Sequence, residues 1–290
     1  MLSKIDIEKE LGKGINIIPF REENIKENSI NLSASEYAWS MTDYEFDIDY
    51  KSDDGNQIIL SKGEKCVFKR NGKEIIVIPP YSTIIIETEE ILGIDGRIGG
   101  TYHSKVGIAS LGIGHIGTML GPNFCGHSLV AIHNVSRECI ELKVGETFVS
   151  VVFNYLNTRF NQSNQTKSGH IEKFSEFGIN ISRDDREFIC HEWKGILESI
   201  NERMENDPKF KDFKSTLNKR KFKKYKSFIN TKNITSSLIL IVVAAIFYIL
   251  AVNLDKGLSK QVWVERYWTI LSATIIVPLL SSIIKNLYNN

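Results

Sequence analysis

Short hydrophobic runs separated by turn residues fill the first half of the chain. The runs are rich in Ile, Val, Thr, Phe and Tyr, the side chains that favour a pleated strand. Strands of this length and spacing predict an antiparallel sandwich or barrel. The predicted strands are 57–60, 66–69, 74–78, 83–87, 129–133 and 147–153. Glycine is dense from residue 93 to residue 126, which indicates tight turns or close backbone approach.

A first helix is predicted at residues 3–11. Ser3 stands where an N-cap is needed, and Ile5, Ile7 and Leu11 recur on one side of the helix.

A second helical pattern follows the last predicted strand. Residues 161–169 (NQSNQTKSG) are polar and indicate a linker or exposed arm. Ser182 then begins a helix, with Asp185 at the position of the capping-box Glu. We expect its apolar stripe to pack on the domain or on a neighbouring subunit. The stripe consists of Ile189, Trp193, Ile196, Leu197 and Ile200.

The pattern changes again near the C-terminus, where two long stretches carry no charge. Residues 233–254 contain 22 such positions in a row, and residues 267–284 contain 18. A buried core helix would normally show a polar stripe, and the first stretch has no charged face. Each stretch is long enough to cross a bilayer. We therefore predict two transmembrane helices, at 233–254 and 267–285.

Charge sets the expected orientation of these spans. The formal net charge is only +1, but residues 206–232 carry ten Lys or Arg against two Asp. The segment between the spans, 255–266, carries three Lys or Arg. By the positive-inside rule the N-terminal domain and the C-terminus are cytoplasmic. Beside a span, the basic segment 209–232 is expected to contact anionic lipid rather than nucleic acid.

The chain is thus predicted to comprise a β domain (1–160), a connecting segment (161–232) and two spans. The connecting segment contains the linker, the amphipathic helix and the basic juxtamembrane residues. The four cysteines show no CxxC spacing and lie in an expected reducing compartment, so we expect free thiols and no zinc site.

Six groups of residues occur in a recognisable order. They are LSKIDIEKEL with GINIIPF, NSINLSAS, IPPYSTIIIETEE, SKVGIASLGI, GPNFCG, and LVAIHN with LKVGETFVSVVF. In this order they resemble the dCTP deaminase branch of the dUTPase superfamily over the first half of the chain. The resemblance implies a mainly β fold, the distorted jelly roll or β-clip of dUTPases, here followed by a helical extension and the two predicted spans.

The resemblance also implies a homotrimer with nucleoside triphosphate sites between subunits. Family deaminases need no zinc, and a carboxylate acts as general base on the attacking water. Arg, Ser and backbone N–H groups hold the phosphates, usually with Mg²⁺.

The sequence departs from the family at its catalytic positions. The general-base position falls on Ala131, and the two motif aspartates fall on Gly121 and Asn31. No Asp or Glu occurs between Asp95 and Glu138. We therefore predict no catalytic residue at the family positions and no resident metal.

The phosphate loop is altered but retains polar groups. Its arginine positions are Lys105 and Ser110, and one of its paired serines is Gly107. Together with Ser104, these residues form a predicted anion cradle, weaker than one with two arginines.

Four of the six histidines lie in the same window. His103 and His115 occupy glycine-rich segments near the expected phosphate and base, so they are candidate ligand contacts. His127 and His133 are predicted to be hydrogen-bonded strand residues.

Three functions remain open from the sequence. The first is a non-catalytic module that senses a nucleotide or related phosphorylated ligand and passes the signal to the membrane helices. Such coupling would fit a role in phage defence. The second is an active dCTP deaminase or dUTP hydrolase with relocated groups, in which Glu87, Glu89 or Glu90 supplies the base. The third is a trimeric membrane scaffold with a vestigial pocket.

Overall fold

The structure, a computed structural model, describes residues 1–47, 50–114, 117–161 and 171–228. The chain divides into two compact units, Met1–Ser215 and Thr216–Asn290. The predicted spans at 233–254 and 267–285, and most of the predicted linker at 161–169, lie outside the described residues. Among the described helices, none is both long and apolar enough to cross a membrane.

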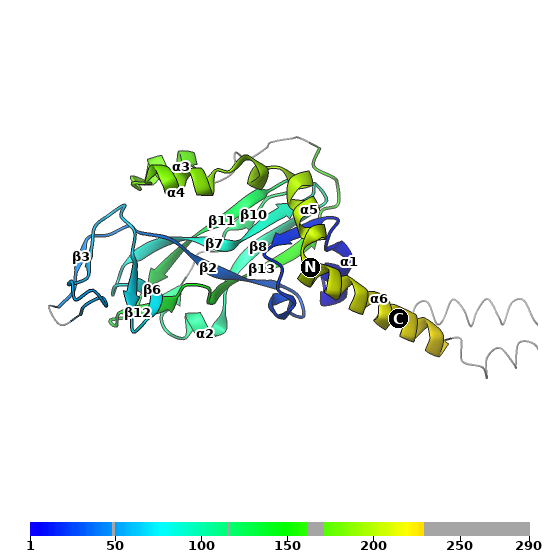
Figure 1. The fold of residues 1–290 in the computed structure, drawn as a ribbon, viewed down its shortest axis with the longest axis horizontal. Helices are drawn as coiled ribbons and strands as arrows, with labels where there is room; N and C mark the ends of the chain where they lie inside the picture. The colour runs from blue at the N-terminus through cyan, green and yellow to red at the C-terminus, as the bar shows by residue number, and fades with distance from the viewer. Residues whose placement is uncertain (48–49, 115–116, 162–170, 229–290) are drawn as a thin grey trace, which may run out of the picture. The chain divides into compact units, whose positions relative to one another are not determined.

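An eight-stranded antiparallel sheet forms the centre of the first unit (Figure 1). Its strand order is β10-β8-β13-β2-β7-β11-β9, and β1 also pairs with β7. The strands are β1 (Ile15–Ile18), β2 (Ile30–Ser40), β7 (Thr83–Ile94), β8 (Ile98–Ser104), β9 (Ile113–Gly114), β10 (Met119–Leu120), β11 (Cys125–Asn134) and β13 (Thr147–Tyr155).

Two smaller sheets complete the β structure. One has the order β12-β6-β5, and the other pairs β3 with β4. The strands are β3 (Tyr44–Glu45), β4 (Ile59–Leu60), β5 (Val67–Arg70), β6 (Lys73–Ile78) and β12 (Ile140–Lys143).

The helical elements are short, except for the last. They are α1 (Lys4–Glu10), η1 (Glu22–Asn24), α2 (Val106–Ala109), α3 (Ile171–Phe177), α4 (Arg183–Ile189), η2 (Glu192–Gly195), α5 (Leu197–Asn206) and α6 (Pro208–Phe228).

The mainly β prediction is confirmed, and the curled antiparallel sheet fits the expected dUTPase-like jelly roll. Each predicted strand coincides with an observed strand, but β7 and β11 extend well beyond the predicted 83–87 and 129–133. Their extensions include polar residues such as Glu90 and His127, which are buried through side-chain hydrogen bonds. Hydrophobic alternation alone therefore underestimates their length.

Helix α1 begins as the sequence predicts. The Ser3 side chain accepts a hydrogen bond from the Asp6 amide, and the Asp6 carboxylate accepts one from the Ser3 backbone N–H, so a capping box is complete. Ile7 and Leu11 are buried, but Ile5 is 63% exposed. The prediction that Ile5 shares one side of the helix with Ile7 and Leu11 is wrong, because a step of two residues is roughly 200° around an α-helix and puts Ile5 nearly opposite Ile7.

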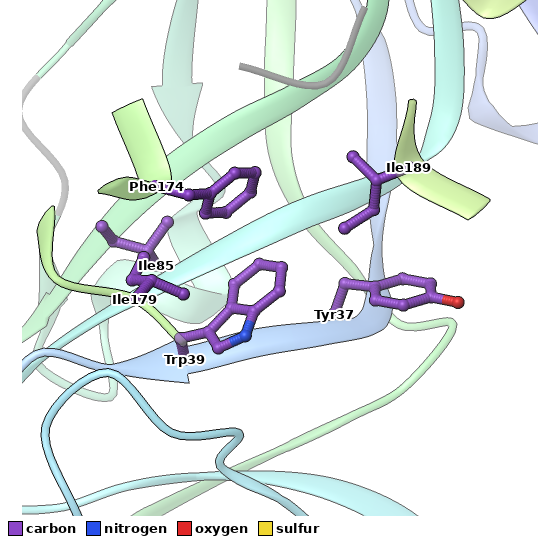
Figure 2. Packing of buried hydrophobic residues seen from close by; sticks show 6 residues of the cluster. All are labelled: Tyr37, Trp39, Ile85, Phe174, Ile179 and Ile189. Atoms are coloured by element: carbon purple, nitrogen blue, oxygen red, sulfur yellow. The ribbon is translucent and has the colours of Figure 1, made fainter. Parts of the chain in front are cut away.

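Helices α3 and α4 lie over one face of the sheet, above β7 and β11 (Figure 1). Beneath them is a buried apolar cluster, which we call the cover cluster: Tyr37, Trp39, Ile85, Phe174, Ile179 and Ile189. In Figure 2, Trp39 rises from β2 towards Phe174 of α3. Their rings meet edge to face with centroids 4.8 Å apart. The helical extension therefore packs on its own domain, which was one of the two predicted alternatives.

The second predicted helix is divided into three pieces, α4, η2 and α5. Ile189 of α4 belongs to the cover cluster, whereas Ile200 of α5 packs with Ile91 and Cys125 in a separate cluster. Ile196, predicted to lie on the stripe, has extended backbone between the pieces and is 38% exposed. The prediction of one continuous helix is wrong, because its apolar residues pack on two separate sites of the sheet.

Aromatic packing holds the start of α6. Phe210 and Phe213 are both buried, and each ring centroid lies about 5 Å from that of Phe20, at 5.1 and 5.0 Å. Lys214 forms an ion pair with Glu205 of α5. The compact unit consequently extends past residue 160, the end of the predicted β domain, to Ser215.

Candidate functional site

The predicted anion cradle occupies the turn where β8 leads into α2. Lys105 is the residue that precedes α2, and its ammonium donates to the Thr147 carbonyl at 3.0 Å and also to the Thr147 hydroxyl. The hydroxyl of Ser110 donates to the Gly107 carbonyl at 2.9 Å. Strand β13 thus fixes the lysine, and the Ser110 side chain closes the short helix.

The outer side of this turn is open. A side chain at Gly107 would meet no atom of the described chain within 4 Å. Val106 of α2 and Leu111 just after it are strongly exposed, at 86% and 55%, and so is Met119 at 83% on β10, which pairs with β8. Exposed apolar side chains at such density are typical of contact surfaces.

The structure places a polar row across three strands beside the cradle. Ser150 on β13 pairs with His103 of β8 on one side and with Asn31 of β2 on the other. The Ser150 hydroxyl donates to the Asn31 side-chain oxygen at 2.7 Å, and His103 bonds the Thr101 hydroxyl at 2.9 Å. Because paired residues point to the same face, these three side chains lie together.

Sequence reasoning identified His103 and Asn31 but missed Ser150 and Thr147. Only strand pairing brings these two β13 residues to the site, and a single sequence gives no pairing signal for them. Ser104, at the end of β8, adjoins Lys105 in the chain. His115 lies outside the described residues.

The family's general-base position lies under the helical extension. Ala131 of β11 pairs with Ile85 of β7 and packs against the cover cluster. The position of the second motif aspartate, Gly121, is open, with no atom of the described chain within 4 Å of a side chain built there.

Two of the three glutamates considered as relocated bases have structural partners. Arg21 bonds Glu89 at 2.5 Å and Glu90 at 2.9 Å. The fully buried Glu90 also accepts from the backbone N–H of Ser33 at 2.7 Å and from its hydroxyl at 2.9 Å. Burial raises the pKa of Glu90, while Ser33 and Arg21 oppose that shift. Glu89 and Glu90 therefore connect β7 to Arg21, which precedes η1, and Glu90 also connects β7 to Ser33 of β2.

Glu87 is different, because neither of its carboxylate oxygens has a hydrogen-bond partner in the described chain. Glu87 is buried, with 1% of its surface exposed. Burial raises the pKa of Glu87 to about 8, although the nearby Lys194 ammonium acts in the opposite direction. At neutral pH the carboxyl group is therefore mostly protonated and uncharged.

Lys194 of η2 enters the same buried region. Its ammonium donates to His127 Nε2 at 3.0 Å and to the Phe188 carbonyl at 2.8 Å, and it lies 3.7 Å from the Phe188 ring centroid. His127 Nδ1 donates to the Thr88 carbonyl at 2.9 Å. Burial, aided by the Lys194 charge, lowers the pKa of His127 to about 4. His127 is therefore neutral, with its proton on Nδ1.

These contacts confirm that His127 is a hydrogen-bonded strand residue. His133 is another, since its Nδ1 bonds the Thr83 hydroxyl at 2.8 Å. The buried carboxyl of Glu87 also lies near Ala131: Glu87 pairs with Leu129, and Ile85 pairs with Ala131. With a side-chain period of two, Glu87 is on the same face as Ala131, one diagonal step away.

Metal chemistry finds little support in the described residues. They contain no group of three or more His, Cys, Asp or Glu side chains that could hold a metal ion. All four cysteines are free thiols, as predicted.

Comparisons with known proteins agree with the sequence resemblance. The family model described as "DCD: dCTP deaminase-like" matches residues 1–156. A dCTP deaminase of Pyrococcus horikoshii is 30% identical over 99 residues, which are 34% of this chain and 62% of that protein.

Solved structures overlap this chain in part. The 2'-deoxycytidine 5'-triphosphate deaminase from Agrobacterium tumefaciens is 12% identical with a TM-score of 0.38, covering 54% of this chain and 48% of that one. The dUTPase from phage phi11 of S. aureus is 10% identical with a TM-score of 0.32, covering 52% and 96%.

Proposed function

This chain belongs to the dCTP deaminase-like family, and from that premise we propose that it is a non-catalytic nucleotide sensor coupled to a membrane segment. The observation that carries the proposal is the environment of Ala131. At the position that the resemblance assigns to the general base, a methyl group packs against the cover cluster. A water molecule activated at this position would need a carboxylate there, whereas the cover cluster that packs on it is apolar and the neighbouring Glu87 carboxyl is buried.

The ligand in this proposal is a nucleotide or a related phosphorylated small molecule. Lys105, with Ser104, Gly107 and Ser110, supplies the anion-binding turn, and the polar row His103–Ser150–Asn31 adjoins it. Lys105 is already oriented by Thr147, so little side-chain entropy is lost when it binds a phosphate. The open space over Gly107 admits the ligand.

The subunit arrangement in this proposal is a homotrimer, as the family resemblance implies. The exposed Val106, Leu111 and Met119 border the anion-binding turn and would be covered by a neighbouring subunit. The two uncharged C-terminal stretches would form the membrane segment. The basic residues of 209–232 would contact anionic lipid, with the N-terminal domain and the C-terminus in the cytoplasm.

A nucleotide panel tests this proposal on the full-length chain purified in detergent, with thermal shift and turnover measured in the same samples. We expect at least one nucleotide to raise the melting temperature without being converted. Gly107→Asp should abolish that shift, because its side chain fits the open space but repels phosphate. Lys105→Ala should weaken binding, whereas Lys73→Ala, an exposed lysine on β6, should not.

The outcomes separate the alternatives. No shift with any nucleotide would contradict sensing and favour the scaffold with a vestigial pocket. Turnover would favour the second candidate, an active dCTP deaminase or dUTP hydrolase with Glu87 as base. The raised pKa of Glu87, on the face that bears Ala131, is the observation behind this candidate. Turnover lost in Glu87→Gln would establish it. In the described conformation, substrate reaches Glu87 only if α4 and η2 move away.

A further inference from the structure

A buried carboxyl group lies where the helical extension meets the sheet. Glu87 belongs to β7, and the elements above it are α4, its C-cap Cys190 and η2. Cys190 packs against the cover cluster, which includes Ile85 of the same strand, and Lys194 bonds His127 of the neighbouring β11. In the described chain the carboxylate oxygens of Glu87 accept no hydrogen bond.

An ionised carboxylate at this position would carry a large desolvation cost. The neutral acid can be buried, but the anion needs hydrogen-bond donors or water. The nearest cation, Lys194, already directs its ammonium to His127 and to the Phe188 carbonyl. The region can accommodate the anion most easily if the helices above it separate from the sheet.

We propose that Glu87 is a proton-controlled latch for the helical extension. The neutral carboxyl allows α4 and η2 to stay on the sheet, and loss of its proton releases them and uncovers the face that bears Ala131. The release itself is independent of the proposed function. Only its consequence, access of a ligand to the uncovered face, rests on that function.

The charged and titratable groups around Glu87 come from every element packed on it. They are Tyr37 of β2, His127 of β11, Asp185 and Arg186 of α4, Cys190 after α4, and Lys194 of η2, with Lys65 paired to Asp185. Burial raises the pKa of Tyr37 to about 12, and that of His127 is lowered to about 4. Neither group changes charge between about pH 6.5 and about pH 8.5.

The sign of the effect follows from linkage. The pKa of Glu87 is raised on docking, so its contribution to docking is full below the undocked value near 4.5 and is lost as pH rises to about 8. Burial lowers the pKa of Lys194, which has the opposite sign and favours docking at alkaline pH. If the Glu87 proton dominates, the docked state weakens as pH rises through this window.

Hydrogen–deuterium exchange of the full-length chain measures this release directly, without any nucleotide. Labelling times are scaled for the pH dependence of intrinsic exchange, and peptides covering 183–196 are compared at about pH 6.5 and about pH 8.5. Release of one proton should raise the opening equilibrium of this segment roughly 20-fold in the wild type. In Glu87→Gln, whose amide does not ionise, that increase should disappear.

Two variants complete the experiment. Glu187→Gln makes the same chemical change at an exposed position on α4 and should keep the wild-type pH dependence. Lys194→Met removes the cation that opposes the Glu87 shift, so the segment should open further at the alkaline end. An equal pH dependence in wild type and Glu87→Gln would overturn the proposal, as would no dependence in the wild type. Neither result would bear on nucleotide binding at Lys105.

Discussion

Glu87 and Glu90 lie three residues apart on β7, and the structure gives them opposite surroundings. Glu90 receives four hydrogen bonds, from the Ser33 backbone and hydroxyl, Arg21 and Asn24. Glu87 receives none from the described chain. A buried carboxylate is stable when donors surround it and costly when they are missing. Glu90 therefore stabilises the folded structure, whereas Glu87 is available to respond to its surroundings.

The Arg21–Glu90 pair gives a prediction at this scale. Arg21→Met removes the only cation bonded to Glu90 among the described residues, so the buried carboxylate keeps its hydrogen bonds from Ser33 and Asn24 but loses its ion pair. We expect a loss of about 3 kcal/mol in the free energy of unfolding, seen in the full-length chain as a melting temperature lower by roughly 6 to 12 °C. Lys62→Met, at an exposed position, should leave it unchanged. Equal melting temperatures for both variants would contradict a structural role for this pair.

At the scale of elements, the helical extension acts as a third layer on the sheet. Its contacts include the backbone N–H of Asn180 to the Gly63 carbonyl at 2.9 Å and the ion pair between Lys65 and Asp185 at 2.9 Å. A side chain at Gly63 would lie 2.3 Å from the Gly178 carbonyl oxygen, so only glycine permits this approach. The extension is therefore held by a backbone hydrogen bond at Gly63 and by a side-chain ion pair at Lys65.

Phe174 is the deepest side chain that α3 contributes. Phe174→Ala removes its contact with Trp39 and should cost about 3 to 5 kcal/mol of local stability, because Phe174 is 1% exposed. We expect faster limited proteolysis within 171–196 while the sheet remains folded. Lys173→Ala, on the exposed side of the same helix, should be cut at the wild-type rate. Unchanged proteolysis in Phe174→Ala would show that the cover does not depend on this ring.

The sequence predicted the elements better than it predicted their partners. Ser3 and Ser182 mark helix starts because capping is a local interaction, and both are confirmed. Hydrophobic runs predicted β7, β11 and β13 of the central sheet, though not the polar ends of β7 and β11. Neither Ser150 beside Asn31 nor Glu87 beneath α4 could be predicted, because both depend on strand register and on a segment about a hundred residues away in the chain.

At the scale of the whole molecule, the compact unit and the family match do not coincide. The match ends at residue 156, whereas the compact unit continues to Ser215. The difference comprises α3, α4, η2, α5 and the start of α6, and these elements bury the cover cluster and the contacts around Phe20. The residues that follow the family-type fold therefore share hydrophobic clusters with it.

Truncation distinguishes the two boundaries. A chain of residues 1–215 should be soluble and cooperatively folded, because all of its apolar clusters are retained. A chain of residues 1–160 exposes Trp39, Ile85 and Ile91 on the sheet and should aggregate or bind a hydrophobic dye. Soluble yield, near-ultraviolet circular dichroism and dye fluorescence would measure the difference. A well-folded 1–160 chain would contradict the importance of the extension.

The position of Ala131 beneath the cover limits which side chains that site can accept. Ala131→Glu alone would place a carboxylate against Phe174 and its neighbours, and the protein would lose stability before it gained a base. A carboxylate at position 131 would need both a polar sheet surface around it and the removal of the helices that cover it. Either change alone would leave the carboxylate buried among apolar side chains or the apolar sheet surface exposed.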